Sequence, residues 1–227
     1  MSRAKLTILA VTIVCASNGL PVKATGNTTK VDSDKQVRAI AGLPLGFVPN
    51  EGQADAKVRF HAHGPGYRVS LTDTEAILTL ALDPETPLRI RLAPAAPERI
   101  TPIDKLQGVA NYYVGNDPVR WRRGIPTFAR VRYEDVYPGI DLVFYGNPSQ
   151  LRFDFVIDPG VDPSVIRLGF DGTKRLHLDS DGNLVMQTGA GPIVLTAPVV
   201  YQEQGGERQP VSGAYDLLGD LQAAFRL

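Results

Sequence analysis

Cysteine is nearly absent from this chain, which has a single one, Cys15, among its 227 residues. Cys15 lies in an N-terminal segment that we expect to be removed, so the mature chain would contain no cysteine. Disulfide bonds, thiol catalysis and cysteine-ligated zinc are then excluded for the mature protein. A domain of this size without disulfides must be stabilised by its apolar core.

A surplus of charge is missing as well. Lys and Arg together number 24, and so do Asp and Glu, which makes the formal net charge zero. A protein that binds nucleic acid through the phosphates needs a basic surplus on one face. The charge balance therefore argues against a nucleic-acid partner.

Long helices are the third feature that the sequence excludes. The chain has 22 glycines and 18 prolines, and the prolines recur too often for a helix of normal length in most windows. Single helical turns are expected only at residues 162–164 and 103–107. Hydrophobic residues make up 43% of the chain, so it can still bury a core, and strands must provide it.

The N-terminus has the three parts of a signal peptide. Arg3 and Lys5 form a basic start, residues 6–16 are apolar and uncharged, and small residues around Ala24 suit a signal peptidase. The apolar run is shorter than the ~20 residues that a membrane-spanning helix needs.

We therefore expect residues 1–24 to be cleaved, which leaves a mature chain with no transmembrane helix. The expected location is secreted or extracytoplasmic, at the cell surface or in the periplasm. Two alternatives are an uncleaved buried helix and a lipoprotein acylated at Cys15. The polar residues 25–42 predict a flexible mature N-terminus.

From residue 43 onward the dominant period of apolar residues is two, which predicts half-buried strands. Residues 76–82 are more continuously apolar, so we expect that strand to be covered on both faces. The alternating segments are residues 57–62, 67–71, 88–92, 151–157, 165–170 and 175–178.

Turn residues separate these segments at intervals of about 8–12 residues. Gly146-Asn147-Pro148 should connect residues 140–145 to 151–157, and Asp181-Gly182-Asn183 should form another hairpin turn. The predicted fold class is all-β, a many-stranded antiparallel, sandwich-like single domain over residues 43–227. Prolines suggest a sub-boundary near residues 93–107, and residues 223–227 end in mid-strand, so the domain is expected to be incomplete at its C-terminus.

Several blocks of the chain resemble the N-terminal β-rich domain of bacterial SBBP-repeat proteins. They are residues 45–53 (LGFVPNEGQ), 64–67 (GPGY), 71–76 (LTDTEA), 111–118 (NYYVGNDP), 133–146 (ending PGIDLVFYG) and 197–203 (APVVYQE). In those secreted or surface proteins the domain precedes β-propeller-type repeats. The resemblance implies an exported bacterial module with such repeats or another surface protein as its partner, and it supplies no catalytic residues.

A cluster of aromatic residues offers a candidate glycan-binding site. Trp121 lies beside Arg120 in an expected loop, and Tyr112 is nearby in the sequence. An exposed ring with flanking hydrogen-bond donors could stack on a sugar of a polysaccharide. The alternative is that Trp121 fills the core, as large aromatics mostly do.

Two patterns suggest metal ions. Asp179, Asp181 and Asn183 have oxygen ligands at alternate positions, as calcium loops do, but Ala190 stands where the closing Glu would be, and a hairpin turn explains the pattern too. His61 and His63 should share one face of a strand. No other cofactor is indicated.

Four carboxylates open the possibility of glycan hydrolysis by a pair of acids. They are Glu134, Asp135, Asp141 and Asp154. Asp141, Asp154 and Arg152 are expected on one sheet face, where cross-strand ion pairs are the alternative.

No catalytic residue is assigned, and three functions stay open. The first is a non-catalytic structural, assembly or adhesion module of an exported or cell-surface protein. The others are a carbohydrate-binding module and a glycan hydrolase.

Overall fold

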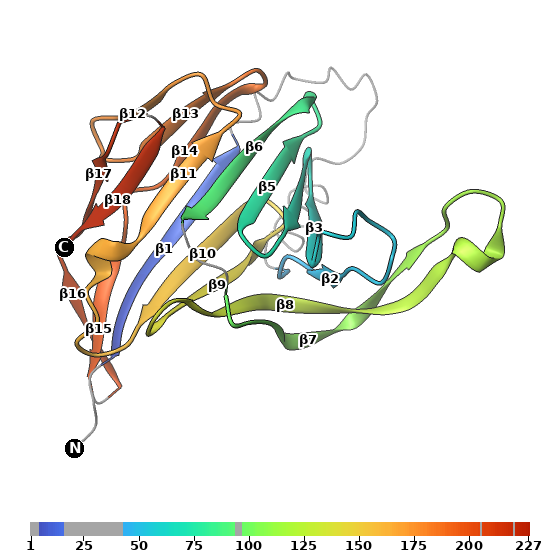
Figure 1. The fold of residues 1–227 in the computed structure, drawn as a ribbon, viewed down its shortest axis with the longest axis horizontal. Helices are drawn as coiled ribbons and strands as arrows, with labels where there is room; N and C mark the ends of the chain where they lie inside the picture. The colour runs from blue at the N-terminus through green and yellow to red at the C-terminus, as the bar shows by residue number, and fades with distance from the viewer. Residues whose placement is uncertain (1–4, 16–42, 94–96, 205, 220) are drawn as a thin grey trace, which may run out of the picture.

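The computed structural model describes residues 5–15, 43–93, 97–204, 206–219 and 221–227, which form two antiparallel sheets packed face to face (Figure 1). The prediction of an all-β, sandwich-like fold is confirmed. Within these residues, no helix has both the length and the apolar character to cross a membrane.

The larger sheet has ten strands in the described part of the chain. Their order is β12-β13-β14-β1-β10-β9-β8-β7, with β15 pairing with both β1 and β16. The strands are β1 (Lys5–Cys15), β7 (Arg99–Tyr112), β8 (Arg122–Tyr137), β9 (Ile140–Asn147), β10 (Gln150–Ile157), β12 (Leu176–Leu178), β13 (Leu184–Thr188), β14 (Gly191–Leu195), β15 (Val200–Gln204) and β16 (Glu207–Val211).

The smaller sheet has eight strands in the order β17-β18-β11-β6-β5-β4-β3-β2. They are β2 (Val48–Pro49), β3 (Phe60–Gly64), β4 (Tyr67–Leu71), β5 (Glu75–Leu80), β6 (Asp83–Ala93), β11 (Arg167–Asp171), β17 (Ala214–Leu217) and β18 (Gln222–Arg226). Near the expected sub-boundary the chain passes from β6 in this sheet to β7 in the larger one. Strands on both sides of that point therefore contribute to one core.

Two 3-10 helices complete the described structure, η1 (Pro118–Arg120) and η2 (Pro163–Val165). Helix η2 confirms the turn expected at residues 162–164, where the Asp162 side chain caps the Ser164 amide. The turn expected at residues 103–107 is wrong. Those residues belong to β7, which pairs with β8 and places Ile103 opposite Arg130, with an irregularity between Lys105 and Val109.

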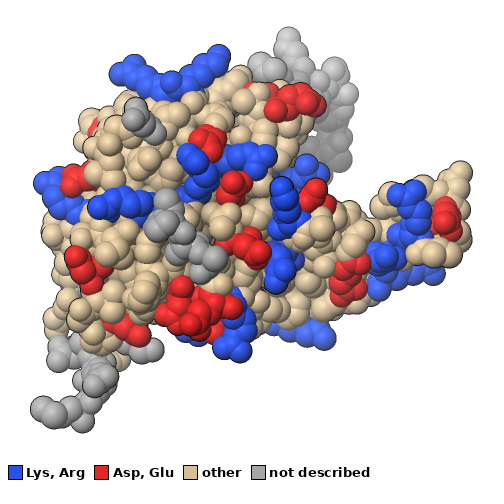
Figure 2. Space-filling model, viewed as in Figure 1, with Lys and Arg blue, Asp and Glu red and all other residues tan. Residues whose placement is uncertain are grey.

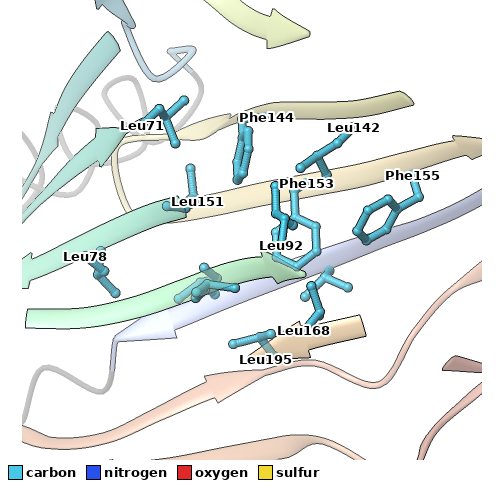
Figure 3. Close-up of a cluster of buried hydrophobic side chains, with 14 of the residues drawn as sticks. Leu71, Leu78, Leu92, Leu142, Phe144, Leu151, Phe153, Phe155, Leu168 and Leu195 are labelled. Carbon is cyan, nitrogen blue, oxygen red and sulfur yellow. The ribbon is translucent and has the colours of Figure 1, made fainter. Parts of the chain in front are cut away.

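Apolar side chains from the two sheets meet in a single layer (Figure 3). The alternation in the sequence of β10 matches the burial of its residues. Every second residue from Leu151 to Ile157 is buried, and the residues between them are partly exposed, as expected for a strand with one face on the core. Strand β5 differs from its prediction. Only Ala76 and Leu78 are buried on it, and Leu82 is 84% exposed in the turn that follows, so one face of β5 is covered rather than both.

The predicted hairpin between residues 140–145 and 151–157 is confirmed as β9–β10. Phe153 pairs with Phe144, and Asp154 pairs with Val143. Strand β9 is entered from β8 through Gly139, whose φ of +74° lies in the left-handed region that glycine adopts without strain.

Strands β7 and β8 form a long hairpin whose far end extends away from the body and includes η1 (Figure 1). The rings near its end are exposed or partly exposed, and Tyr113 is 60% exposed. We refer to the end of this hairpin, residues 111–124, as the arm tip.

Strand β1 occupies the position that most affects the architecture. It is the apolar run of the predicted signal peptide, and it lies in the interior of the larger sheet as a strand, not as the helix that the uncleaved alternative assumed. It pairs with β10 on one side and with β14 and β15 on the other. Residues 16–42, with the predicted cleavage point and flexible segment, lie outside the described residues.

Charges on the outer face of the smaller sheet are neutralised across strands. Arg89 bonds Glu75 and Arg91 bonds Asp171, each at 2.8 Å. Figure 2 shows positive and negative side chains interspersed over this side of the molecule.

The Tyr133 hydroxyl joins the two sheets. Tyr133 on β8 is fully buried and donates a 2.7 Å hydrogen bond to the carbonyl oxygen of Thr72, which follows β4. Without that donor the Thr72 carbonyl loses its side-chain partner in the interior.

We predict that Tyr133→Phe lowers the free energy of unfolding by about 1–2 kcal/mol, the usual effect of leaving a buried acceptor unpaired. The measurement is the urea unfolding midpoint of the full chain. Tyr113→Phe removes the same atom from an exposed ring and is the matched control. Equal midpoints for the two variants would contradict the role of the inter-sheet bond.

Candidate functional site

A cleft of about 650 Å³ opens on the outer face of the larger sheet, away from the small sheet. We call it the arginine cleft, because three guanidinium groups line it together with two tyrosines and one carboxylate. The lining residues are Arg130, Val143, Tyr145, Arg152, Asp154, Val156, Val199, Val200, Tyr201, Arg208 and Pro210.

The strand register explains how these residues meet. On β10, the outward residues alternate with the buried Phe153 and Phe155, so Arg152 and Asp154 point to the outer face. Arg152 pairs with Tyr145 on β9. The opposite wall comes from β15 and β16, and the backbone of β1 runs between the walls, with Thr7 opposite both Val156 and Tyr201.

Asp154 is the acidic group of the arginine cleft. Its burial raises its pKa from 3.8 to about 6, although a 3.0 Å hydrogen bond from the Tyr145 hydroxyl and the nearby arginines favour the charged form. Asp154 therefore gains a proton on mild acidification, which leaves the cleft more positive.

The three arginines differ in how they are held. Arg208 lies over the Tyr201 ring, 4.5 Å from its centroid, and Arg130 bonds Asp104 at 3.0 Å. Arg152 donates to the Gln150 side chain at 3.0 Å, while its Nε is buried without a partner among the described residues. The Arg152 Nε is thus a buried donor whose hydrogen-bonding capacity is not satisfied by the described residues.

Trp121, predicted to bind sugar, lies at the arm tip and not in the core. Its ring packs edge-on against Tyr113 at 5.3 Å, the Arg123 guanidinium lies 4.9 Å above it, and its Nε1 donates to the Gly115 carbonyl. Arg120 is exposed in η1. The protein's own side chains thus occupy the surroundings of the indole ring.

Tyr112 contacts different neighbours from Trp121. Its hydroxyl lies 2.5 Å from Nε2 of His61, in a second cleft of about 290 Å³ that His63 and Arg68 also line. The predicted group of Trp121, Tyr112 and Arg120 is therefore divided, with Tyr112 against β3 and Trp121 against Tyr113.

His61 and His63 do share a face of β3, with ring centroids 5.7 Å apart. Burial, His63 and Arg68 lower the pKa of His61 to about 4, so this ring is neutral near pH 7. Its Nδ1 is buried without a partner in the described part of the chain. There, no group of three or more His, Cys, Asp or Glu residues is placed to hold a metal.

The predicted calcium loop is the hairpin turn between β12 and β13. Asp179 accepts hydrogen bonds at 2.9 Å from the amides of Asp181 and Asn183 and from the Asn183 side chain. The Asn183 oxygen accepts from the Ala197 amide. These bonds use side-chain oxygens of Asp179 and Asn183, two of the three residues that a calcium ion would need.

Ion pairs and backbone bonds hold three of the four candidate carboxylates. Glu134 accepts from Arg99, Asp141 pairs with Arg132, and Asp135 accepts from the Gly139 amide. Asp154 is the carboxylate that lines the arginine cleft.

Residues 47–227 match the protein family described as "Domain of unknown function (DUF7948)". The chain belongs to this family. No curated protein and no solved structure matches the chain.

The DUF7948 region contains every residue that lines the arginine cleft and every described strand except β1. Arg130, Tyr201 and Arg208 were not identified from the sequence, because they come from strands far apart along the chain. The expected shared face of Arg152 and Asp154 was the only signal that pointed to this surface.

We predict that Asp154→Asn stabilises the protein near pH 8, because it removes a partly buried charge from the folded state. The folded pKa is raised, so the wild-type penalty is present above about pH 6 and disappears as the pH falls below about 4. The expected gain is on the order of 1 kcal/mol after allowance for solvent screening.

The measurement is the thermal midpoint of both proteins from pH 4 to pH 8. Their difference should shrink toward acid, while the titration of His61 affects both proteins equally. A variant that is less stable than wild type at pH 8 would refute this account of Asp154.

Proposed function

We propose that this chain is a non-catalytic adhesion module of an exported or cell-surface protein, and that its arginine cleft binds an acidic polysaccharide. The observation that carries the proposal is the convergence of Arg130, Arg152 and Arg208 on one cleft with two tyrosines. Guanidinium groups recognise carboxylates through paired hydrogen bonds, and tyrosine rings pack on sugar faces.

Electrostatics support an anionic ligand over a neutral one. The chain has no net charge, yet three arginines line the cleft with one carboxylate, and that carboxylate has a raised pKa. Arg130 is paired with Asp104, so Arg152 and Arg208 supply the surplus of positive charge. The unpartnered Nε of Arg152 supplies a buried donor. The site that we propose therefore lies away from Trp121, the candidate for sugar stacking in the sequence.

Export is the second part of the proposal. It rests on the basic, apolar and small-residue segments of residues 1–24. The resemblance to the domain that precedes β-propeller-type repeats in SBBP-repeat proteins supports a surface role, with such repeats or another surface protein as partner.

Glycan hydrolysis is the alternative function, and one observation favours it. Asp154, with a pKa of about 6, could act as a general acid in the arginine cleft. A hydrolase also needs a second carboxylate within about 5–10 Å. Asp141, on the adjacent strand, is paired with Arg132, which favours binding over hydrolysis.

We predict that the full chain binds polygalacturonate, and that it binds the methyl-esterified polymer at least tenfold more weakly. The two polymers have the same sugar ring and differ in the charge of the carboxyl group. Arg152→Ala should weaken binding about tenfold, the effect of one charge-assisted hydrogen bond. Calorimetry with both polymers provides the measurement.

Trp121→Ala is the matched control, because it removes a larger side chain from the arm tip and should leave the affinity unchanged. If Trp121→Ala abolishes binding and Arg152→Ala does not, the site is at the arm tip. Equal affinity for the charged and esterified polymers would refute the anionic ligand, and release of reducing ends would favour the hydrolase.

We predict that a bacterial host exports the protein and that the mature form begins at Thr25. N-terminal sequencing of the extracytoplasmic fraction tests the cleavage. Leu9→Arg places a charge in the apolar run and should retain the full chain in the cytoplasm. A mature N-terminus at an acylated Cys15 would establish the lipoprotein instead, and uncleaved wild-type protein in the cytoplasm would refute export.

A further inference from the structure

Strand β1 is held on both edges by backbone pairing. Ile13 lies opposite Leu151 of β10 on one side and Leu195 of β14 on the other. Toward its other end, Thr7 lies between Val156 of β10 and Tyr201 of β15. Removal of β1 would leave two facing edges with unpaired amides and carbonyls.

The inner face of β1 is part of the core. Val11 and Ile13 are 0% and 2% exposed, and Val11 lies opposite the buried Phe153. Without β1, the buried side chains of the neighbouring strands would face an open channel. Exposed apolar surface of this kind drives association.

The same residues cannot serve both as a cleaved leader and as a strand of the mature domain. Lys5–Cys15 contains most of the apolar run of the predicted signal peptide. The family match also separates β1 from the rest of the domain, since residues 47–227 contain every described strand except β1.

Contacts with the smaller sheet hold the two flanks of β1 apart. On the β14 side, the Tyr215 hydroxyl of β17 donates to the Thr196 carbonyl at 2.9 Å. On the β8–β10 side, the Tyr133 hydroxyl donates to Thr72. Because neighbouring strands are spaced by about 4.8 Å, closing the channel would require one flank to move by about that distance against these contacts.

We infer that the space occupied by β1 is a strand-acceptor slot, which in the exported protein is filled by an extended segment of another exported polypeptide. The inference rests on the export part of the proposed function. The incoming segment adds a strand by backbone hydrogen bonds, with apolar side chains at alternate positions facing the core. The partner through which the module is assembled is therefore a polypeptide that contributes one β-strand.

The outer face of the slot defines a further property of the incoming segment. Thr12 of β1 lies opposite Arg152, and both side chains are partly exposed. Arg152 belongs to the arginine cleft, so an acidic residue at the position of Thr12 would place a carboxylate beside its guanidinium. The partner strand is therefore expected to be apolar inward and acidic outward at this position.

The experiment exchanges the strand after the whole chain has folded. A protease site is substituted within residues 25–42, the full chain is folded and cut, and a fluorescent peptide of residues 5–15 with Cys15→Ser is added in excess. We expect the labelled peptide to replace the cut fragment and to elute with the body on gel filtration.

Peptide variants separate strand insertion from non-specific adhesion. A Val11→Asp, Ile13→Asp peptide should be taken up at least tenfold less, because it would bury charges in the core. A Thr12→Glu peptide should be taken up at least as well as the parent. A body that loses the cut fragment yet stays monomeric, melts cooperatively and takes up no peptide has closed its sheet, and that result overturns the inference.

The state of the N-terminus distinguishes failure of the proposed function from failure of the strand-acceptor slot. If the exported protein retains residues 1–24, its own β1 fills the slot, and both the proposed cleavage and the partner strand are refuted even where peptide exchange succeeds. If residues 1–24 are removed and no peptide enters, the strand-acceptor slot alone is refuted.

Discussion

The packing of two sheets on one apolar layer is the interaction on which the rest of this structure depends. Every strand must turn one set of alternate residues inward, and this fixes which side chains reach the outer faces. Phe153 and Phe155 are fixed in the layer, and their neighbours Arg152 and Asp154 consequently point into the arginine cleft. The alternation that buries one set of side chains in the core therefore also determines which side chains lie on the outer surface.

The fold class and several hairpins could be predicted from the sequence, because they depend on residues that are close along the chain. The alternation of residues 151–157 and the Gly146-Asn147-Pro148 turn determine the β9–β10 hairpin almost completely. The conformation of residues 103–107 could not be predicted from their local sequence. Their pairing with β8, more than 20 residues away, outweighs a local preference for a turn.

The arginine cleft could be predicted only in part for the same reason. Asp154 and Arg152 share a strand, and their common face follows from the period of two. Arg208 reaches the cleft through β16, and its place depends on the order of strands in the sheet, which a single sequence does not encode locally. The charge balance of the whole chain was uninformative for a similar reason, because a net charge of zero does not show that ion pairs on both sheets coexist with a local gathering of arginines in one cleft.

The position of β1 has a consequence for the order of events during synthesis. Thr12 bonds Thr196 across 184 residues, so the first strand to leave the ribosome is among the last that can be placed. Forming such distant contacts is slow. Until β10, β14 and β15 have all been made, the N-terminal segment lacks strand partners on one or both of its edges, which under the proposed export leaves it available to the export machinery. Under that proposal, the connectivity of the chain separates in time the two uses of this segment, first as a leader and later as a strand.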